Sequence, residues 1–200
     1  MSARNPNLKF IPPMLPVLVA APPEGDRWLH EIKYDGYRTQ LVIAGGKAQA
    51  FTHAGKDWSA KFATLVDAAS SLRCRSAVID GEAAVQDERG VTRFEELRSA
   101  MRWHPERVTL FAFDLLHLNG EDFRGRAIEE RRARLAELLA SADNRITFSV
   151  GSKARVQRSS RRPIARALRA SSASARAAPT GAATPRPGRR PRPSPRARST

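Results

Sequence analysis

The alternation of apolar and polar residues predicts short strands in the first third of the chain. Segment 28–32 alternates as an extended strand does, and segment 37–43 is a second run rich in β-branched and aromatic residues. The second run ends at Gly45-Gly46, a pair typical of a two-residue hairpin turn, so segment 47–52 is expected to pair with it antiparallel. Apolar runs predict three later strands, at 76–85, 108–116 and 145–150.

Helical spacing of apolar residues is found between these strands. Segment 59–72 carries apolar residues on one face, and Ser59 is placed to cap its first turn. Segment 94–101 predicts a short helix, and segment 127–140 predicts an amphipathic helix that buries Ile128 and three leucines. Because strands and helices come in clusters rather than in regular βαβ alternation, the predicted fold class is α+β.

Composition divides the 200 residues into three parts. Residues 1–25 are punctuated by proline, which predicts an extended segment on the surface of the next part of the chain. Residues 26–150 carry the predicted strands and helices of one domain. Residues 151–200 hold 14 of the 35 Lys and Arg and none of the 20 Asp and Glu, so the first 150 residues are balanced at 21 basic against 20 acidic side chains. The net charge of +15 therefore belongs almost entirely to the tail.

Beyond residue 150 the composition no longer supports a packed core. Arg, Ala, Ser and Pro make up 39 of the last 50 residues, which contain no aromatic side chain. Such a segment cannot bury enough apolar surface to offset the entropy of ordering, so 151–200 is expected to be disordered.

The composition also excludes several classes of protein. A single cysteine, Cys74, excludes an internal disulfide framework and a cysteine-built zinc site, and it fits a reducing compartment. The apolar stretch 10–21 is interrupted by prolines, unlike a signal peptide, and no run reaches transmembrane length. We therefore expect a soluble cytoplasmic protein with no membrane partner.

The strongest candidate for chemistry is segment 31–38, with the sequence EIKYDGYR. It places Lys33 at the end of a predicted strand, just before a glycine-containing turn, where a desolvated or cation-flanked amine can lose its proton and attack. Arg38 could supply the positive neighbour or bind phosphate. The spacing alone is weak, since Lys and Asp beside a glycine turn also occur as solvated hairpin residues.

Two further elements place acids inside apolar strands. Asp80 and Glu82 flank Gly81 in one strand, where charge is costly unless it binds a cation or hydrogen-bonds a ligand. Phe113 precedes Asp114 in the most apolar strand and could stack on a base. Taken singly, the acids are explained as turn residues and Phe113 as core, but three such elements in one chain argue against coincidence.

In this order the motifs resemble the ATP-dependent DNA ligases, most closely the bacterial ligase domains associated with end-joining repair. The resemblance covers residues 10–150 and implies an antiparallel-sheet nucleotidyl-transferase (adenylation) domain, similar to an ATP-grasp fold and incomplete here. In that family the lysine matching Lys33 attacks the α-phosphate of ATP and holds AMP as a phosphoramidate. The AMP then passes to the 5′-phosphate of a DNA nick, and the 3′-hydroxyl displaces it.

The resemblance also implies roles for individual residues. Glu31 would lie at the adenine edge, and Arg38 near the phosphates or the nick. Glu82 would lie at the ribose or the metal ion, and Phe113 would stack on the adenine. The implied cofactors are ATP and Mg²⁺ or another divalent cation. The implied partners are nicked double-stranded DNA and end-joining repair proteins, with the chain a monomer in the bacterial cytoplasm or nucleoid.

The chain departs from the family pattern in two places. Where the family has Ser-Arg-x-Gly, segment 52–55 is Thr-His-Ala-Gly, and His53 cannot reproduce an arginine fork. The later family motifs, Glu-Gly-x-Val-x-Lys and Lys-x-Lys, and the OB-fold domain that comes after them, are missing. We therefore expect self-adenylation to be weak or absent and nick sealing to be absent.

The tail can be explained as the product of a shifted reading frame. Codons chosen for 167–175 give, when read one base out of frame, Leu-Glu-Gly-Ile-Val-Ser-Lys-Arg, which contains the missing family motif. Codons for 178–183 give Pro-Tyr-Arg-Ser-Gly in the same shifted frame. We interpret 151–200 as a frameshift product that begins near Val150, from a real mutation or a sequencing error.

Other interpretations stay open. A selected basic arm would bind DNA phosphates through counterion release, weakly and without sequence preference. Combined with a degenerate nucleotide pocket, it would make a non-catalytic nucleic-acid-binding protein. RNA ligases and messenger-RNA capping enzymes share the Lys-x-Asp-Gly core, but the residues flanking it and segment 113–116 favour a DNA ligase. Trapping of adenylate on Lys33 would separate an enzyme from a binding protein.

Overall fold

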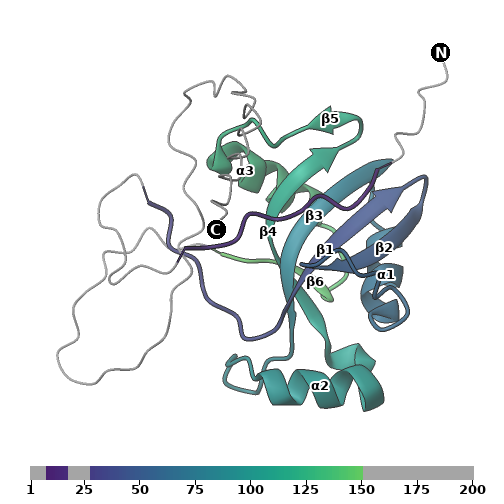
Figure 1. The fold of residues 1–200 in the computed structure, drawn as a ribbon, viewed down its shortest axis with the longest axis vertical. Helices are drawn as coiled ribbons and strands as arrows, with labels where there is room; N and C mark the ends of the chain where they lie inside the picture. Colours follow the sequence, from purple (N-terminus) through teal and green to yellow (C-terminus); the bar gives the residue numbers. More distant parts are fainter. Residues whose placement is uncertain (1–7, 18–27, 151–200) are drawn as a thin grey trace, which may run out of the picture.

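A six-stranded, mostly antiparallel sheet forms the centre of the computed structural model, which describes residues 8–17 and 28–150 (Figure 1). The strands lie in the order β2-β1-β3-β4-β5, with β6 paired in parallel to β4. Their bounds are β1 Tyr37–Ala44, β2 Lys47–Thr52, β3 Ser76–Ala84, β4 Thr109–Leu118, β5 Glu121–Asp122 and β6 Ile146–Phe148. The helices are α1 Ala63–Ser70, α2 Phe94–Trp103 and α3 Ile128–Leu139, with the 3-10 turn η1 at Pro105–Arg107. The predicted α+β class is confirmed.

The β1–β2 hairpin forms where the glycine pair predicted it. Gly45 and Gly46 have φ angles of 58° and 75°, the left-handed conformation that both central residues of a type I′ turn require. The turn sets the register so that Ala44 lies opposite Lys47. The predicted pairing of 37–43 with 47–52 is therefore confirmed.

The pleat of the sheet separates a core face from a polar face. Leu41 of β1 lies opposite Ile79 of β3, and both are fully buried in the hydrophobic core with Leu65 of α1. The neighbouring pair, Gln40 and Asp80, must point to the other face because successive side chains alternate. The polar face of the sheet therefore includes Gln40 and Asp80, which lie in the middle of the β1–β3 pairing.

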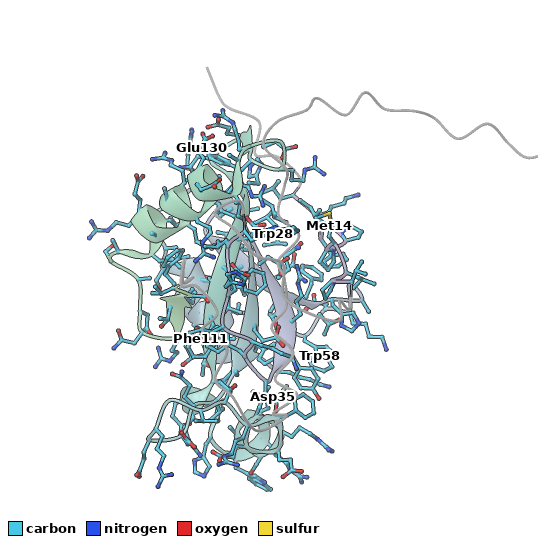
Figure 2. All side chains as sticks on the ribbon, turned by 90° about the vertical axis from the view of Figure 1, so that its left-hand side faces the viewer. Met14, Trp28, Asp35, Trp58, Phe111 and Glu130 are labelled. Carbon is cyan, nitrogen blue, oxygen red and sulfur yellow. The ribbon has the colours of Figure 1, made fainter. Side chains whose placement is uncertain are left out.

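Segment 8–17 lies across the polar face without forming a helix or strand, as the prolines predicted (Figure 1). The Gln40 side chain exchanges two hydrogen bonds with the backbone of Ile11, at 2.8 and 2.9 Å. Figure 2 shows Met14 of this segment to the right of the strands. Leu65 of α1 is buried on the core face of the sheet, so segment 8–17 covers the opposite, polar face.

Two predictions for the first third of the chain are wrong. Segment 28–32 is not a strand, since only His30 forms an isolated bridge there, and the neighbouring Glu31 is held by a side-chain ion pair instead of a ladder. The first helix begins at Ala63, and Ser59 does not cap it. The Ser59 hydroxyl accepts a hydrogen bond from the backbone N–H of Ala50, so tertiary structure uses the group that local capping would have used.

The remaining predicted elements are confirmed to within a few residues. Strands β3, β4 and β6 and helices α2 and α3 lie where apolar runs and helical spacing predicted them. The two-residue strand β5 and the turn η1 were not predicted. Within 8–17 and 28–150 no helix is long and apolar enough to cross a membrane. The predicted disorder and frameshift at 151–200 lie outside the described residues.

Candidate active site

A cavity of about 380 Å³ opens on the polar face of the sheet. Strands β1, β3 and β4, segments 8–17 and 31–34, and the start of α3 supply its walls. The structure brings all five predicted site residues into this one cavity: Glu31, Lys33, Arg38, Glu82 and Phe113. The volume falls in the range of small-molecule sites.

The neighbours of Lys33 in its motif fix the position of the lysine. Tyr34 stacks on Phe111 of β4 with ring centroids 4.1 Å apart and ring planes 11° apart. The backbone N–H of Asp35 donates to the Thr92 hydroxyl, and the Asp35 carboxylate accepts the N–H of Phe94 at the start of α2. Lys33 itself is exposed at the cavity wall. Its two following residues are thus anchored to different elements while its amine stays accessible.

Gly36 anchors the turn after Lys33 by packing directly against the backbone of β3. A Cβ atom at Gly36 would lie 2.1 Å from the carbonyl oxygen of Ala83 in β3. Only glycine allows the turn after Lys33 to pack this closely on the strand that carries Glu82. The glycine of the motif therefore sets the distance between the lysine and the acids of β3.

Arg38 and Asp80 form a two-pronged ion pair across β1 and β3. Arg38 Nε and Nη2 donate to the two Asp80 oxygens at 3.2 and 2.8 Å, and Nη1 donates to the carbonyl of Met14 at 3.2 Å. Burial raises the pKa of the Asp80 carboxyl, and the Arg38 guanidinium opposes that shift. Burial disfavours charge on Arg38, but its hydrogen bonds to Asp80 and the nearby acids outweigh it, so the pKa of Arg38 lies above its usual value.

Glu82 and Phe113 lie on the same polar face as Arg38. Glu82 is buried two residues after Asp80, so both carboxylates of the Asp-Gly-Glu motif point into the cavity. Gly81 between them faces the core, where a Cβ atom would lie 2.9 Å from the Leu110 side chain. The Arg38 guanidinium lies over the Phe113 ring, 5.3 Å from the ring centroid. The cavity thus combines acids, a cation and an aromatic face.

Two buried arginines of α3, which sequence patterns did not single out, hold acids that line the cavity. Arg131 holds Asp114 through Nε and Nη2, at 2.7 and 3.0 Å. Arg132 Nη1 lies 2.6 Å from Glu31 Oε1. Helical spacing carried a signal for them, because 131 and 132 lie between Ile128 and Leu135, at positions where an amphipathic helix normally places apolar residues. Charge at such positions indicates a buried partner.

Two features of the described residues bear on metal and nucleotide binding. No group of three or more His, Cys, Asp or Glu side chains in 8–17 and 28–150 is arranged to hold a metal ion. His53 is exposed in the turn after β2 and does not line the cavity. Mg²⁺ is usually bound by one or two carboxylates together with substrate phosphates, so a site for it does not require three protein ligands.

The arrangement can hold a nucleotide and bring an amine to its phosphates. An aromatic face suits a base, the carboxylates suit hydroxyl or amino donors, and the guanidinium and amine suit phosphate. A phosphate bound beside Lys33 would meet a nucleophile that only needs to lose a proton. These are the requirements of a nucleotidyl-transferase that forms a covalent lysyl intermediate.

Comparison with known proteins identifies the family. A sequence model described as "ATP dependent DNA ligase domain" matches residues 14–171. The "Multifunctional non-homologous end joining protein LigD" of Pseudomonas aeruginosa is 38% identical over 141 residues, which are 70% of this chain and 17% of that protein. The chain belongs to the ATP-dependent DNA ligase family.

Solved structures agree with this assignment. The ligase domain of LigD from M. tuberculosis superposes with a TM-score of 0.56 and 30% identity, over 64% of this chain and 41% of that one. A mycobacterial DNA ligase D complexed with ATP and MES superposes with a TM-score of 0.53 and 29% identity, over 62% of this chain and 40% of that one. The chain therefore spans less than half the length of each of these relatives.

Proposed function

We propose that residues 26–150 are the nucleotide-binding part of a DNA ligase adenylation domain, with Lys33 as the residue that becomes linked to AMP. The observation that carries this proposal is the convergence of Lys33, Glu82 and Phe113, from three separate parts of the chain, on one cavity. A family member solved with ATP supports ATP as the cofactor. Glu31 would contact the edge of the adenine and Phe113 its face.

The proposed reaction is a transfer of AMP to the lysine amine. A bond forms between Lys33 Nζ and the α-phosphorus of ATP, the bond from that phosphorus to the bridging oxygen breaks, and pyrophosphate leaves while the amine loses a proton. Arg38 lies at the same wall and would stabilise negative charge on the phosphates or at the nick. In the family the rest of the site is expected from the later motifs, Glu-Gly-x-Val-x-Lys and Lys-x-Lys, which this sequence lacks.

Mg²⁺ or another divalent cation fits this site as part of the ATP complex. Glu82 would supply a carboxylate oxygen, and phosphate oxygens would supply further ligands. When bound, the ion would neutralise charge on the phosphates.

The proposed substrate is nicked double-stranded DNA, as the family implies. The relatives act in non-homologous end joining, which makes end-joining repair proteins the proposed partners. The chain is proposed to act as a monomer in the bacterial nucleoid, where both the nicked DNA and the repair proteins would be present. The chain as it stands is proposed to seal nicks poorly or not at all, because the motifs that come after β6 in the family are missing from its sequence.

Labelling with ATP tests the proposed role of Lys33. The 200-residue chain is incubated with Mg²⁺ and ATP carrying a labelled α-phosphate, and both retained ATP and covalent label are measured. We expect ATP to be retained and covalent label to be weak or absent. Any label should be acid-labile, lost in Lys33→Arg and kept in Lys47→Arg, which changes an exposed lysine of β2 outside the cavity.

Two results would contradict the proposal. Failure of the chain to retain ATP would show that the cavity is not a nucleotide site. Label that persists in Lys33→Arg would show that another residue is the nucleophile. Ready sealing of a nicked duplex, abolished in Lys33→Ala, would contradict the proposed impairment while supporting the proposed chemistry.

We further propose that 151–200 is a frameshift product. Resequencing the gene from the codon for Phe148 and translating all three frames tests this. A neighbouring frame that gives Glu-Gly-Ile-Val-Ser-Lys, then Pro-Tyr-Arg-Ser-Gly and an OB-like continuation would support it. A neighbouring frame without ligase-like sequence would contradict it. The 14 basic residues of the tail would then favour the second candidate function, non-catalytic binding of nucleic acid.

A further inference from the structure

Arg132 forms a buried junction between α3 and three other segments. Its side chain is 8% exposed, as is that of Glu31, whose Oε1 accepts a 2.6 Å hydrogen bond from Arg132 Nη1. The same Nη1 donates to the carbonyl of Phe113 at 3.0 Å, and Nη2 donates to the carbonyl of Ser149. The guanidinium also lies over the Phe148 ring, 4.8 Å from its centroid.

The junction lies where the outer edge of β4 changes partner. Strand β6 pairs with β4 at Leu110–Ala112, and β5 pairs with it at His117–Leu118. Within the described residues no strand covers the interval between them. The Phe113 carbonyl lies in that interval and receives the guanidinium hydrogen bond. Arg132 therefore replaces a strand partner at the point where β4 borders the cavity.

Arginine suits this junction because of the shape of its donor group. The guanidinium is planar, stays charged and presents several N–H groups in fixed directions, so one side chain can serve three acceptors. A lysine ammonium would keep the charge but not this fixed fork. The geometry therefore restrains the Glu31 carboxylate and the Phe113 backbone together.

We propose that Arg132 is a positioning residue that fixes Glu31 as a hydrogen-bond acceptor and so makes the cavity prefer adenine over guanine. This inference rests on the proposed nucleotide site. A carboxylate paired with a guanidinium accepts hydrogen bonds and cannot donate them. Adenine offers an amino group at its C6 edge, whereas guanine offers a carbonyl oxygen there. Guanine would place its oxygen against an acceptor, and the fixed position of Glu31 prevents the carboxylate from moving away.

The inference is tested by comparing the affinities of the full chain for ATP and GTP by equilibrium dialysis. The variants are Arg132→Lys and Glu31→Gln, with Arg134→Lys as the matched control. Arg134 is an exposed arginine of the same helix, bonded to Glu137 and absent from the cavity wall. The unfolding midpoint of each variant in urea checks the fold.

We expect the wild type and Arg134→Lys to prefer ATP by about 10- to 100-fold, the value of one hydrogen bond to a charged group. Arg132→Lys and Glu31→Gln should each reduce that ratio by about tenfold or more. The variant that combines Arg132→Lys with Glu31→Gln should lose no more of the preference for ATP than either single variant, because both changes remove the same restraint. If Arg132→Lys does not fold, Arg132→Met combined with Glu31→Gln removes both buried charges and should fold with the same loss of preference.

The ratio of the ATP affinity to the GTP affinity distinguishes a positioning role of Arg132 from a purely structural one. If Arg132→Lys weakens ATP and GTP binding by the same factor, or leaves the ratio unchanged, the inference is wrong while the proposed function stands. If the wild type retains ATP without preference over GTP, the inference is again wrong by itself. If the wild type retains neither nucleotide, both the proposed function and this inference are overturned.

Discussion

Replacing Gly36 by alanine would drive the turn after Lys33 away from β3. The added Cβ would lie 2.1 Å from the carbonyl oxygen of Ala83, 3.0 Å from the carbonyl carbon of Ala83 and 3.1 Å from the Ala84 Cβ. All three atoms belong to a fully buried strand whose backbone is paired on both sides. The contact cannot be relieved by rotation of a side chain, so the turn itself must move.

The cost depends on the size of that movement. Carbon and oxygen atoms in close contact lie about 3.3 Å apart, so the turn must retreat by about 1 Å. Overpacking of this kind costs about 1–3 kcal/mol. Alanine also restricts the unfolded chain, which returns about 0.4–1 kcal/mol. We expect a net loss of about 1–2 kcal/mol in the free energy of unfolding, or roughly 3–8 °C in Tm.

Urea unfolding followed by tryptophan fluorescence measures this loss. Gly125→Ala is the matched control, because a Cβ atom there meets nothing within 4 Å and the residue has no left-handed φ. We expect the control to be unchanged or slightly stabilised. An unfolding midpoint for Gly36→Ala equal to that of Gly125→Ala would refute the argument that close approach to β3 requires glycine in the motif.

Two further perturbations test other parts of the structure. Burial lowers the pKa of His117 below 6.5, and its Nε2 accepts a hydrogen bond from the N–H of Gly120. The neutral His117 ring therefore stabilises the folded state at pH values above the pKa that His117 has in the unfolded chain. This contribution is lost as the pH falls from that value towards the lower pKa in the folded protein. The urea midpoint should therefore drop more steeply below about pH 6.5 in the wild type than in His117→Gln. Gln40→Ala removes both hydrogen bonds to Ile11 and should speed tryptic cleavage after Lys9 several-fold, measured by mass spectrometry; an unchanged rate would show that these bonds do not hold the segment.

Local patterns in the sequence were sufficient to predict most of the sheet. The glycine pair at 45–46 predicted the hairpin because the turn conformation depends only on those two residues and their neighbours. The alternation around Gly81 predicted that two acids lie inside a strand, and the pleat then places both on one face. The failed strand at 28–32 shows the limit of such patterns, because alternation does not reveal whether a neighbouring strand is available to pair.

The candidate site was predicted only in part because its residues are held by distant partners. Lys33 and Phe113 could be selected from their motifs, and their shared cavity agrees with that selection. Arg131 was not selected, since its role depends on Asp114, which lies 17 residues away in another element. Asp35 also gained a use that the motif did not reveal, as an acceptor for the first N–H of α2.

The sequence by itself determined the family, the order of most of the strands and helices, and the lysine that carries the proposed chemistry, because these depend on residues close together along the chain. The tertiary structure decided which groups surround that lysine. Glu31 and Arg132 are 101 residues apart, yet they form a 2.6 Å ion pair inside the molecule. A buried charge requires a partner, but only the folded arrangement of β4, β6 and α3 determines which one it meets.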